Sequence, residues 1–358
     1  MQQQLLPGDP FPWRGSYAPG SPDDGFDTLA VGRYAVVCFL GPAGGGDPAV
    51  AAMLAEVKRR KDVFDDRHAA FFAVSADPSD EASGRLAENL PGFRPLRDPD
   101  LAAAAQCGLV ERRGSVGGLA VRRCAFVLDP GLRVLAVLPL SEPAAFAERL
   151  IALLAGLPPP ARTALPAPVL MLPRVFEPDL CRVLIEAFER SGGGAGLDSG
   201  GGGQGRKRRR RDCLLLDEAL RGAVRQRIER RAAPMIRRAF QFEATRLERY
   251  LVACYDAAEG GHFRAHRDDA AGPGVAHRRF AVTINLNAED YEGGDLAFPE
   301  FGPQTYRAPT GGAVVFSCSL LHEVLTVTSG RRFAFLPLLH DEAAQKARER
   351  HLELAAAS

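Results

Sequence analysis

The pattern of apolar and polar positions divides the chain into two halves with different expected secondary structure. In the first half, short apolar runs alternate with amphipathic stretches, which is typical of an α/β layer with some parallel strand pairing. The apolar runs predict strands at Tyr34–Leu40, Ala69–Ser75, Arg123–Leu128 and Arg133–Leu138. The amphipathic stretches predict helices at Ala49–Asp62, Leu101–Cys107 and Glu142–Ala155. We therefore expect an α/β domain over residues 1–157.

The second half predicts a β-rich domain with flanking helices. Helical periodicity covers Pro178–Arg190 and about Leu216–Phe240. Short alternating segments then run from Arg246 to His340, interrupted by Gly-Gly and Pro-Thr-Gly-Gly turns. This pattern favours an all-β barrel or jelly roll over residues 169–345.

Two segments interrupt both patterns. Residues 158–168 are dense in proline and predict a stiff, extended linker between the domains. Residues 191–205 are mostly glycine and have too much backbone freedom to fold alone. With the basic run Arg206–Arg211 that follows, they predict a flexible loop at 191–211, which could act as a substrate lid.

Composition limits the partners that this chain can attract. Among 358 residues, 45 Lys and Arg nearly balance 44 Asp and Glu, so no global field draws nucleic acid or anionic membranes. The run Arg206–Arg211 could grip phosphates, but no aromatic residues interleave it for base stacking, so we interpret it as a solvated loop edge. The chain has neither a long apolar run nor the features of a signal peptide, and we expect a cytoplasmic protein. Its seven scattered cysteines are interpreted as reduced core residues.

The candidate chemistry lies in the second half. His266 and Asp268 stand two apart at an expected strand end, so both side chains can face one ion, and His322 follows on a later strand. Two imidazoles and one carboxylate on one face of an octahedron leave the other face open, which suits Fe(II) chemistry with a co-substrate and O2. A closed zinc site would instead favour four ligands, usually cysteines at C-x-x-C spacing, and the sequence has no such pair.

An arginine ten positions after His322 suggests the co-substrate. Arg332 is expected on the neighbouring barrel strand, where its guanidinium could hold a distal carboxylate in bidentate fashion, and this predicts 2-oxoglutarate. Because a strand alternates faces, Arg331 should be solvated. We interpret His262 and His277 as surface histidines, and Arg264 as either a substrate contact or a surface ion pair.

Several motifs of the second half resemble one enzyme family in order and spacing. They are residues 251–256, 266–268, 284–287, 292–296, 312–316 and 322–324, together with Arg332. Over roughly residues 165–340 they look like the prolyl-4-hydroxylase branch of the 2-oxoglutarate- and Fe(II)-dependent dioxygenases. The resemblance implies a double-stranded β-helix in which His266, Asp268 and His322 bind iron.

The same resemblance implies further site residues and cofactors. Arg332 would anchor 2-oxoglutarate, Tyr255 matches a pocket tyrosine, and Asn285 stands where some members have a co-substrate tyrosine. Fe(II), 2-oxoglutarate and O2 are implied, with ascorbate as an additional reductant. The expected reaction is hydroxylation of an aliphatic C–H, of prolyl type, in a peptide, protein or free amino acid. An intact Asp268 favours hydroxylation over halogenation, because halogenating relatives carry a small residue there.

The first half resembles the peroxiredoxin branch of thioredoxin-like proteins. The likeness is carried by residues 6–11, 37–40, 72–77 and 123–130. In that family a peroxidatic thiolate stands in a Pro-x-x-x-Thr-x-x-Cys turn at a helix N-terminus. Counting from Pro42, the threonine and cysteine positions hold Gly46 and Ala49. Arg123 matches an arginine that would polarise the peroxide, and Cys38 lies on a strand. We therefore expect a non-catalytic domain that serves as scaffold, dimerisation surface or docking module.

Two alternatives remain open at this point. The chain could be a thiol peroxidase through its first half, or a nucleic-acid-binding oxygenase or sensor that uses Arg206–Arg211. The expected partners are a small-molecule, peptide or protein substrate and a second copy of the chain in a homodimer. Neither nucleic acid nor a membrane is an expected partner.

Overall fold

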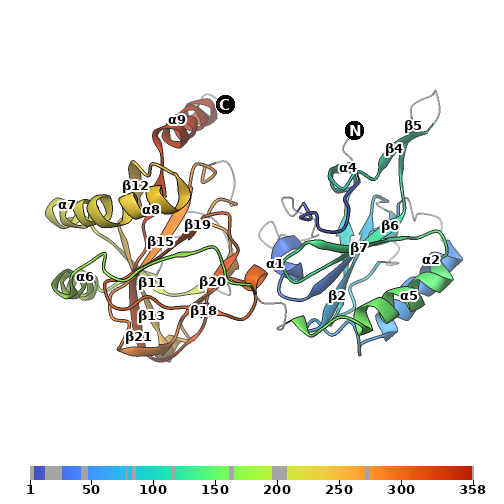
Figure 1. The fold of residues 1–358 in the computed structure, drawn as a ribbon, viewed down its shortest axis with the longest axis horizontal. Coiled ribbons are helices and arrows are strands. Elements are labelled where there is room, and N and C mark those ends of the chain that lie inside the picture. The colour runs from blue at the N-terminus through green and yellow to red at the C-terminus, as the bar shows by residue number, and fades with distance from the viewer. Residues whose placement is uncertain are drawn as a thin grey trace. The chain divides into compact units, whose positions relative to one another are not determined.

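The chain folds into two units. The computed structural model describes residues 4–12, 26–41, 47–77, 79–82, 86–113, 118–160, 165–195, 208–270 and 274–356 (Figure 1). Unit 1 comprises Met1–Pro166 with Pro299–Pro303, and unit 2 comprises Ala167–Phe298 with Gln304–Ser358. The division in the chain falls within the proline-rich segment 158–168, of which residues 161–164 lie outside the described residues.

Unit 1 is built on one mixed sheet with the strand order β3-β2-β1-β6-β7. Its strands are β1 (Tyr34–Phe39), β2 (Ala69–Ser75), β3 (Phe93–Arg97), β6 (Cys124–Leu128) and β7 (Val134–Pro139). The first three pair in parallel, whereas β6 is antiparallel to β1 and β7 is antiparallel to β6. This is the arrangement of a thioredoxin-like fold, as predicted for the first half.

Helices of unit 1 cover both faces of this sheet. Side chains alternate along β1, so Tyr34, Val36 and Cys38 join a core with α2 (Pro48–Arg59) and α5 (Pro143–Ala155). Ala35, Val37 and Phe39 face a second core with α1 (Phe26–Ala30) and α4 (Ala102–Gln106). The remaining elements are α3 (Ser79–Ala82) and the hairpin of β4 (Val110–Arg113) and β5 (Gly118–Val121).

The helices of unit 2 begin with α6 (Pro178–Ser191), which has proline in its first turn and ends at Gly192 with φ of 75°. The helix expected at 216–240 is present but divided into α7 (Glu218–Arg227), the π-helical turn η3 (Ile228–Ala232) and α8 (Ala233–Phe240). Pro234 explains the division, because a proline inside a helix removes a backbone donor and crowds the preceding turn. A helix that the sequence did not reveal, α9 (Glu342–Ala356), ends the described chain.

Two sheets form the β-structure of unit 2. The larger has the order β12-β22-β15-β21-β13-β11-β9, with β8, β16 and β19 attached at its side. Its strands are β8 (Leu170–Leu172), β9 (Gly194–Ala195), β11 (Arg211–Leu214), β12 (Arg246–Glu248), β13 (Leu251–Asp256), β15 (Phe280–Asn285), β16 (Tyr291–Gly293), β19 (Ala313–Ser317), β21 (Val327–Phe335) and β22 (Leu338–His340). The smaller has the order β10-β14-β20-β17-β18, with β10 (Arg208–Arg209), β14 (His262–His266), β17 (Leu296–Ala297), β18 (Thr305–Tyr306) and β20 (His322–Val324).

Because side chains alternate along each strand, the larger sheet has one face packed in the hydrophobic core and an opposite face that carries polar side chains. Cys254, Ile284 and Phe333 point into the core that α6, α7 and α8 cover. Tyr255, Asn285 and Arg332 are their immediate neighbours in sequence and therefore point to the opposite face. Residues of both sheets line a common pocket there. This is the double-stranded β-helix expected for the second half.

Three sequence interpretations need correction. The loop expected at 191–211 is ordered at both ends, in β9 and from Arg208 onward, while residues 196–207 lie outside the described part. Arg210 is not a solvated residue, because only 8% of it is exposed. His277 is not a surface histidine either, because only 4% of it is exposed. The burial of these two side chains depends on how distant segments of the chain fold together, and the local sequence does not show this.

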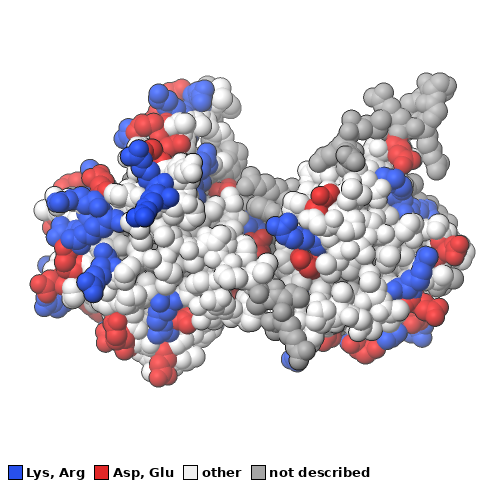
Figure 2. All heavy atoms as spheres, viewed as in Figure 1, with Lys and Arg blue, Asp and Glu red and all other residues white. Residues whose placement is uncertain are grey.

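Other features agree with the composition. Figure 2 shows acidic and basic side chains interspersed on the visible surface, as expected from a net charge of +1. All seven cysteines are buried and free. In the described part of the chain, no helix combines the length and the apolar character that crossing a bilayer requires.

Candidate metal centre

Three ligand-type side chains converge at one edge of the smaller sheet. His266 ends β14, Asp268 follows two residues later, and His322 begins β20, which pairs with β14. His266 and His322 are directly paired in this register. The pairing explains why residues far apart in sequence meet, and one ligand atom from each residue lies within 4.8 Å of the others.

The distances and hydrogen bonds of the triad suit a metal ion. Asp268 Oδ1 lies 3.8 Å from His266 Nε2, and Asp268 Oδ2 lies 3.6 Å from His322 Nε2. His266 Nδ1 donates to the Arg264 carbonyl at 2.8 Å, and His322 Nδ1 donates to the Leu320 carbonyl at 3.0 Å. A neutral imidazole that donates through Nδ1 keeps its lone pair on Nε2. Both lone pairs are therefore available to an ion beside Asp268.

Burial and charge keep the ligands in their metal-binding protonation states. Burial, together with the neighbouring His322, lowers the pKa of His266 to about 3. Burial alone would raise the pKa of Asp268, but His322, His266 and the nearby Arg249 lower it by more. At neutral pH the site therefore presents a neutral His266 and an ionised Asp268.

Aromatic rings surround the two histidines. The Phe263 ring stacks on His266 with centroids 3.7 Å apart, and the Phe316 ring lies 4.6 Å from His322. Phe298 lies further out, at 6.4 Å from His322. Such apolar walls hold the imidazoles in place and limit the access of water to the triad.

Arg332 lies on the polar face of the larger sheet and is 98% buried, since its exposed fraction is 2%. Its Nη2 donates to Asn285 Oδ1 at 3.4 Å, whereas Nε and Nη1 have no hydrogen-bond partner among the described residues. Arg331 instead pairs with Glu189 at 2.7 Å and its side chain is 44% exposed. The buried guanidinium thus has two nitrogens without partners that can donate to a carboxylate.

The strand that carries Arg332 differs from the one expected. β21 follows β20 in sequence, but it pairs with β13, β15 and β16 of the larger sheet. The expectation that Arg332 lies on a strand neighbouring His322 was therefore wrong. The chain crosses from one sheet to the other between them, which places Arg332 on the sheet opposite the metal ligands.

Tyr255 and Asn285 lie beside Arg332. Tyr255 is directly paired with Arg332, whose guanidinium carbon is 5.1 Å from the centre of the tyrosine ring. The Tyr255 hydroxyl accepts a hydrogen bond from Arg210 Nη1 at 3.2 Å. Asn285 Nδ2 donates to the Ala308 carbonyl at 2.7 Å, which turns Oδ1 towards Arg332. All three predicted co-substrate residues are thus together.

Two arginines near the triad were not predicted as site residues. Arg210 lines the same pocket as the triad, where it bonds Tyr255 and pairs with Asp212 at 2.9 Å. Arg249 also lines this pocket and adopts a φ of 62°, which is uncommon for a residue with a side chain. The Arg-x-Asp spacing of Arg210 and Asp212 could have predicted their ion pair, because residues two apart on a strand face the same side. Nothing in the local sequence predicted that Arg249 lines the pocket.

The donor set fits a non-haem iron. Two imidazoles and a carboxylate match the facial arrangement of Fe(II) oxygenases, and the two unpartnered nitrogens of the buried Arg332 fit the far carboxylate of a keto acid. Arg264, which is exposed on the triad strand, contributes its carbonyl rather than its guanidinium to the site.

Sequence comparison assigns the segment that carries the triad to a family. Residues 250–339 match the model of the 2OG-Fe(II) oxygenase superfamily. A PKHD-type hydroxylase of a Synechococcus strain is 36% identical over 89 residues, which are 24% of this chain and 39% of that protein. A second, from Thioalkalivibrio sulfidiphilus, is 36% identical over 98 residues, 25% of this chain and 44% of that protein. The chain thus spans about two fifths of the length of these relatives.

Two solved structures are each similar to part of the chain. The viral collagen prolyl hydroxylase of Paramecium Bursaria Chlorella virus-1 has a TM-score of 0.38 and 18% identity, and the match covers 48% of this chain and 94% of that one. The peroxidoxin BcpB of Mycobacterium tuberculosis has a TM-score of 0.37 and 23% identity, with coverage of 43% and 99%.

Proposed function

From the premise that residues 250–339 form a 2OG-Fe(II) oxygenase domain, we propose that the chain is an Fe(II)- and 2-oxoglutarate-dependent hydroxylase. The observation that carries the proposal is the pairing of a metal triad on one sheet with a buried, half-unpartnered arginine on the other. This combination would accommodate both an ion and a dicarboxylate.

Within this proposal the triad holds the iron. His266, Asp268 and His322 supply three ligand atoms through side chains whose tautomers and charges are already set. Bound Fe(II) would supply the one-electron chemistry that activates O2 at the expense of the keto acid. The residues themselves neither gain nor lose electrons. Their part is to leave one side of the ion open to co-substrate, oxygen and the target C–H bond.

Arg332 is the proposed anchor for 2-oxoglutarate. A carboxylate beside this guanidinium would accept hydrogen bonds from nitrogens that otherwise remain buried without partners. Asn285 holds Nη2 of the same guanidinium, and Tyr255 lies against its face. These contacts orient the fork before the co-substrate arrives, so little ordering is needed on binding.

The target is proposed to be an aliphatic C–H of prolyl type, in a peptide, a protein or a free amino acid. Support comes from the curated relatives, which are named PKHD-type hydroxylases. Arg210 and Arg249 lie in the pocket with the triad and would meet the polar parts of such a substrate. Phe263, Phe316 and Phe298 would keep water from the iron while the C–H bond is aimed at it.

The binding half of this proposal is tested spectroscopically. Anaerobic addition of Fe(II) and then 2-oxoglutarate to the full chain should produce a weak charge-transfer band in the visible. The His322→Ala variant should lack the band, because the triad then has only two ligands. A wild-type protein without the band, or a variant that retains it, would contradict the assignment.

The reaction itself is tested by mass spectrometry. Candidate proline-containing peptides and free amino acids are incubated with the chain, Fe(II), 2-oxoglutarate, O2 and ascorbate. The expected result is a gain of one oxygen atom in one of them, matched by formation of succinate. Succinate formation that no candidate increases would argue against a prolyl-type substrate while leaving the co-substrate assignment intact.

A further inference from the structure

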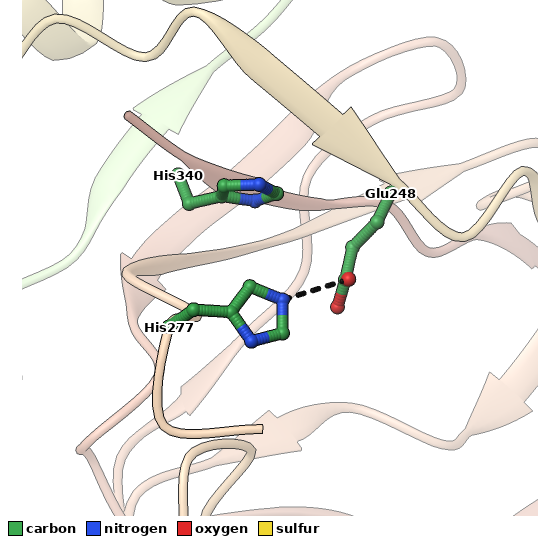
Figure 3. A group of neighbouring side chains, drawn as sticks. All are labelled: Glu248, His277 and His340. Atoms are coloured by element: carbon green, nitrogen blue, oxygen red, sulfur yellow. Dashed lines mark hydrogen bonds and ion pairs between the residues drawn. The ribbon is translucent and has the colours of Figure 1, made fainter. Parts of the chain in front are cut away.

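A second group of ligand-type side chains lies in unit 2, outside the iron triad. Glu248 ends β12, His340 ends β22, and His277 lies in the turn before β15 (Figure 3). In the β12–β22 register Arg246 is paired with His340, so Glu248 is the diagonal neighbour of His340 on the same face. One ligand atom from each of the three residues lies within 4.8 Å of the other two. The iron triad meets the same limit.

Both histidines of this group are buried and incompletely hydrogen-bonded. His277 is 4% exposed and His340 is 2% exposed. Nδ1 of each ring has no hydrogen-bond partner among the described residues. Buried imidazole nitrogens are ordinarily satisfied by protein or by an ordered ligand, so two orphaned nitrogens in one group call for an explanation.

The partners of the other nitrogens indicate the tautomers. His340 Nε2 lies 2.9 Å from Gln345 Oε1, and His277 Nε2 lies 2.9 Å from Glu248 Oε2. A carbonyl or carboxylate oxygen accepts, so each Nε2 carries a proton and each Nδ1 carries a lone pair. Gln345 holds the His340 ring from α9 in the way that an outer carboxamide orients a metal-binding histidine. In Figure 3 the two rings lie one above the other, with Glu248 beside the His277 edge.

The charged groups around Glu248 leave its Oε2 able to bind a cation. Arg278 Nε binds Oε1 at 2.6 Å, whereas Oε2 faces His277 and lies 3.6 Å from Arg348. The Arg348 side chain is 37% exposed and can turn towards solvent when a cation arrives. The Arg278 contact is to the other oxygen and is compatible with an ion on Oε2.

We propose that Glu248, His277 and His340 bind a second divalent metal ion, of zinc type, each through one ligand atom. Two imidazoles with one carboxylate, completed by water, are a ligand set that zinc accepts. His340 would bind through Nδ1, whereas His277 would bind through Nε2 with its proton moved to Nδ1, so that its hydrogen bond to Glu248 becomes a shared bond to the ion. The proposal does not depend on the hydroxylase assignment, because no residue of the iron triad takes part.

Such an ion would connect three separate segments of unit 2. It would join β12, β22 and the turn at His277, and through Gln345 it would hold the start of α9. The same turn carries Arg278, whose Nη1 donates to the Asp268 carbonyl at 3.2 Å. The second ion would therefore stabilise the segment next to the iron ligands without touching substrate.

The competing explanation is a purely hydrogen-bonded cluster that fastens α9 to the sheet. Metal stoichiometry separates the two explanations, since a hydrogen-bonded cluster binds no ion. The full chain is stripped with a chelator and titrated with Zn²⁺ against a chromophoric competitor. We expect two equivalents for the wild type and one for the His266→Ala, His322→Ala double variant, because only the triad is then lost.

Variants of the second group complete the test. His340→Gln and Glu248→Gln should each leave one equivalent, and His262→Ala, a part-buried histidine outside both groups, should leave two. Gln345→Ala should weaken the second equivalent by about 10- to 100-fold, as loss of an outer-shell partner does. Circular dichroism confirms that each variant is folded. If the double variant binds no Zn²⁺, or His340→Gln still binds two equivalents, the proposal is overturned.

Cobalt provides a readout independent of folding yield. Co²⁺ in a four-coordinate site absorbs strongly in the visible, whereas Co²⁺ in an open octahedral triad absorbs weakly. The double variant loaded with Co²⁺ should show the strong absorption, and adding His340→Gln to it should remove the absorption. A colourless Co²⁺-treated double variant would contradict a site at Glu248, His277 and His340.

Discussion

Arg332 is a buried cation with incomplete hydrogen bonding, and its geometry determines how the site can bind a dicarboxylate. A guanidinium presents two parallel N–H groups to one carboxylate, whereas an ammonium presents a single point charge. Asn285 and Tyr255 restrict the rotation of this fork. Charge alone is therefore not sufficient at this position.

Replacing Arg332 by lysine should raise the KM for 2-oxoglutarate by about 10- to 100-fold, because a hydrogen bond to a charged group contributes about 1.5–3 kcal/mol. Steady-state succinate formation measures this. Arg331→Lys is the matched control, since Arg331 is the next residue, is exposed and pairs with Glu189. Equal effects of the two substitutions would show that Arg332 has no special role.

The protonation of His266 predicts the pH dependence of stability in the metal-free protein. Its pKa falls from 6.5 to about 3 on folding, mainly through burial. Between these values the unfolded chain binds the proton and the folded chain does not, so stability is full above about pH 6.5 and declines as pH falls towards 3. Urea unfolding at pH 7 and pH 5 should show this decline. His266→Asn should decline less, and an identical decline would disprove the contribution of His266.

At the scale of elements, alternation along strands explains much of what the sequence could predict. The spacing of His266 and Asp268, the choice of Arg332 over Arg331, and the alternating β-pattern are all local and could be read directly. The burial of Arg210 and His277 could not be read, because it depends on which distant strands pair and which turns fold over them. The strand β3 was also missed, because its sequence Phe-Arg-Pro-Leu-Arg lacks a clear apolar run.

The turn at Gly294 supports both the sheet and the co-substrate arginine. Its φ is 64°, and a Cβ there would lie 2.7 Å from Val327 Cγ2 and 3.2 Å from Arg332 Cδ. Gly294→Ala should therefore lower the free energy of unfolding by about 1–3 kcal/mol and also raise the KM for 2-oxoglutarate. Gly192→Ala is the control, because its φ is 75° with no atom within 4 Å of the added Cβ. If Gly192→Ala changed KM equally, the contact with Arg332 would not be the cause.

At the scale of the whole molecule, the two units differ in what their side chains can do. Unit 2 contains the candidate iron site, whereas the thiols of unit 1 are buried and poorly ionised. Burial raises the pKa of Cys38, Cys107 and Cys124. Ala49 occupies the first turn of α2, and positions 42–46 of the preceding turn lie outside the described residues. We propose that unit 1 serves as a scaffold, dimerisation surface or docking module.

The full chain should consequently show no thiol-dependent consumption of hydroperoxide at neutral pH. The thiolate is the reacting form, and these cysteines hold their protons because they are buried. A coupled peroxidase assay with a thioredoxin or glutaredoxin reductant measures this. Consumption that disappears in a Cys38→Ser variant would restore the peroxidase alternative.

The hydrogen bonds that hold the two ligand histidines have a consequence for protein engineering. Each ring is held by the carbonyl two residues before it in its own segment, from Arg264 to His266 and from Leu320 to His322. His262 makes the same contact with Gly260 without belonging to the triad. The correct tautomer is thus encoded in three consecutive residues, so a designer could transplant these short segments to a foreign barrel and keep the nitrogen lone pairs correctly presented.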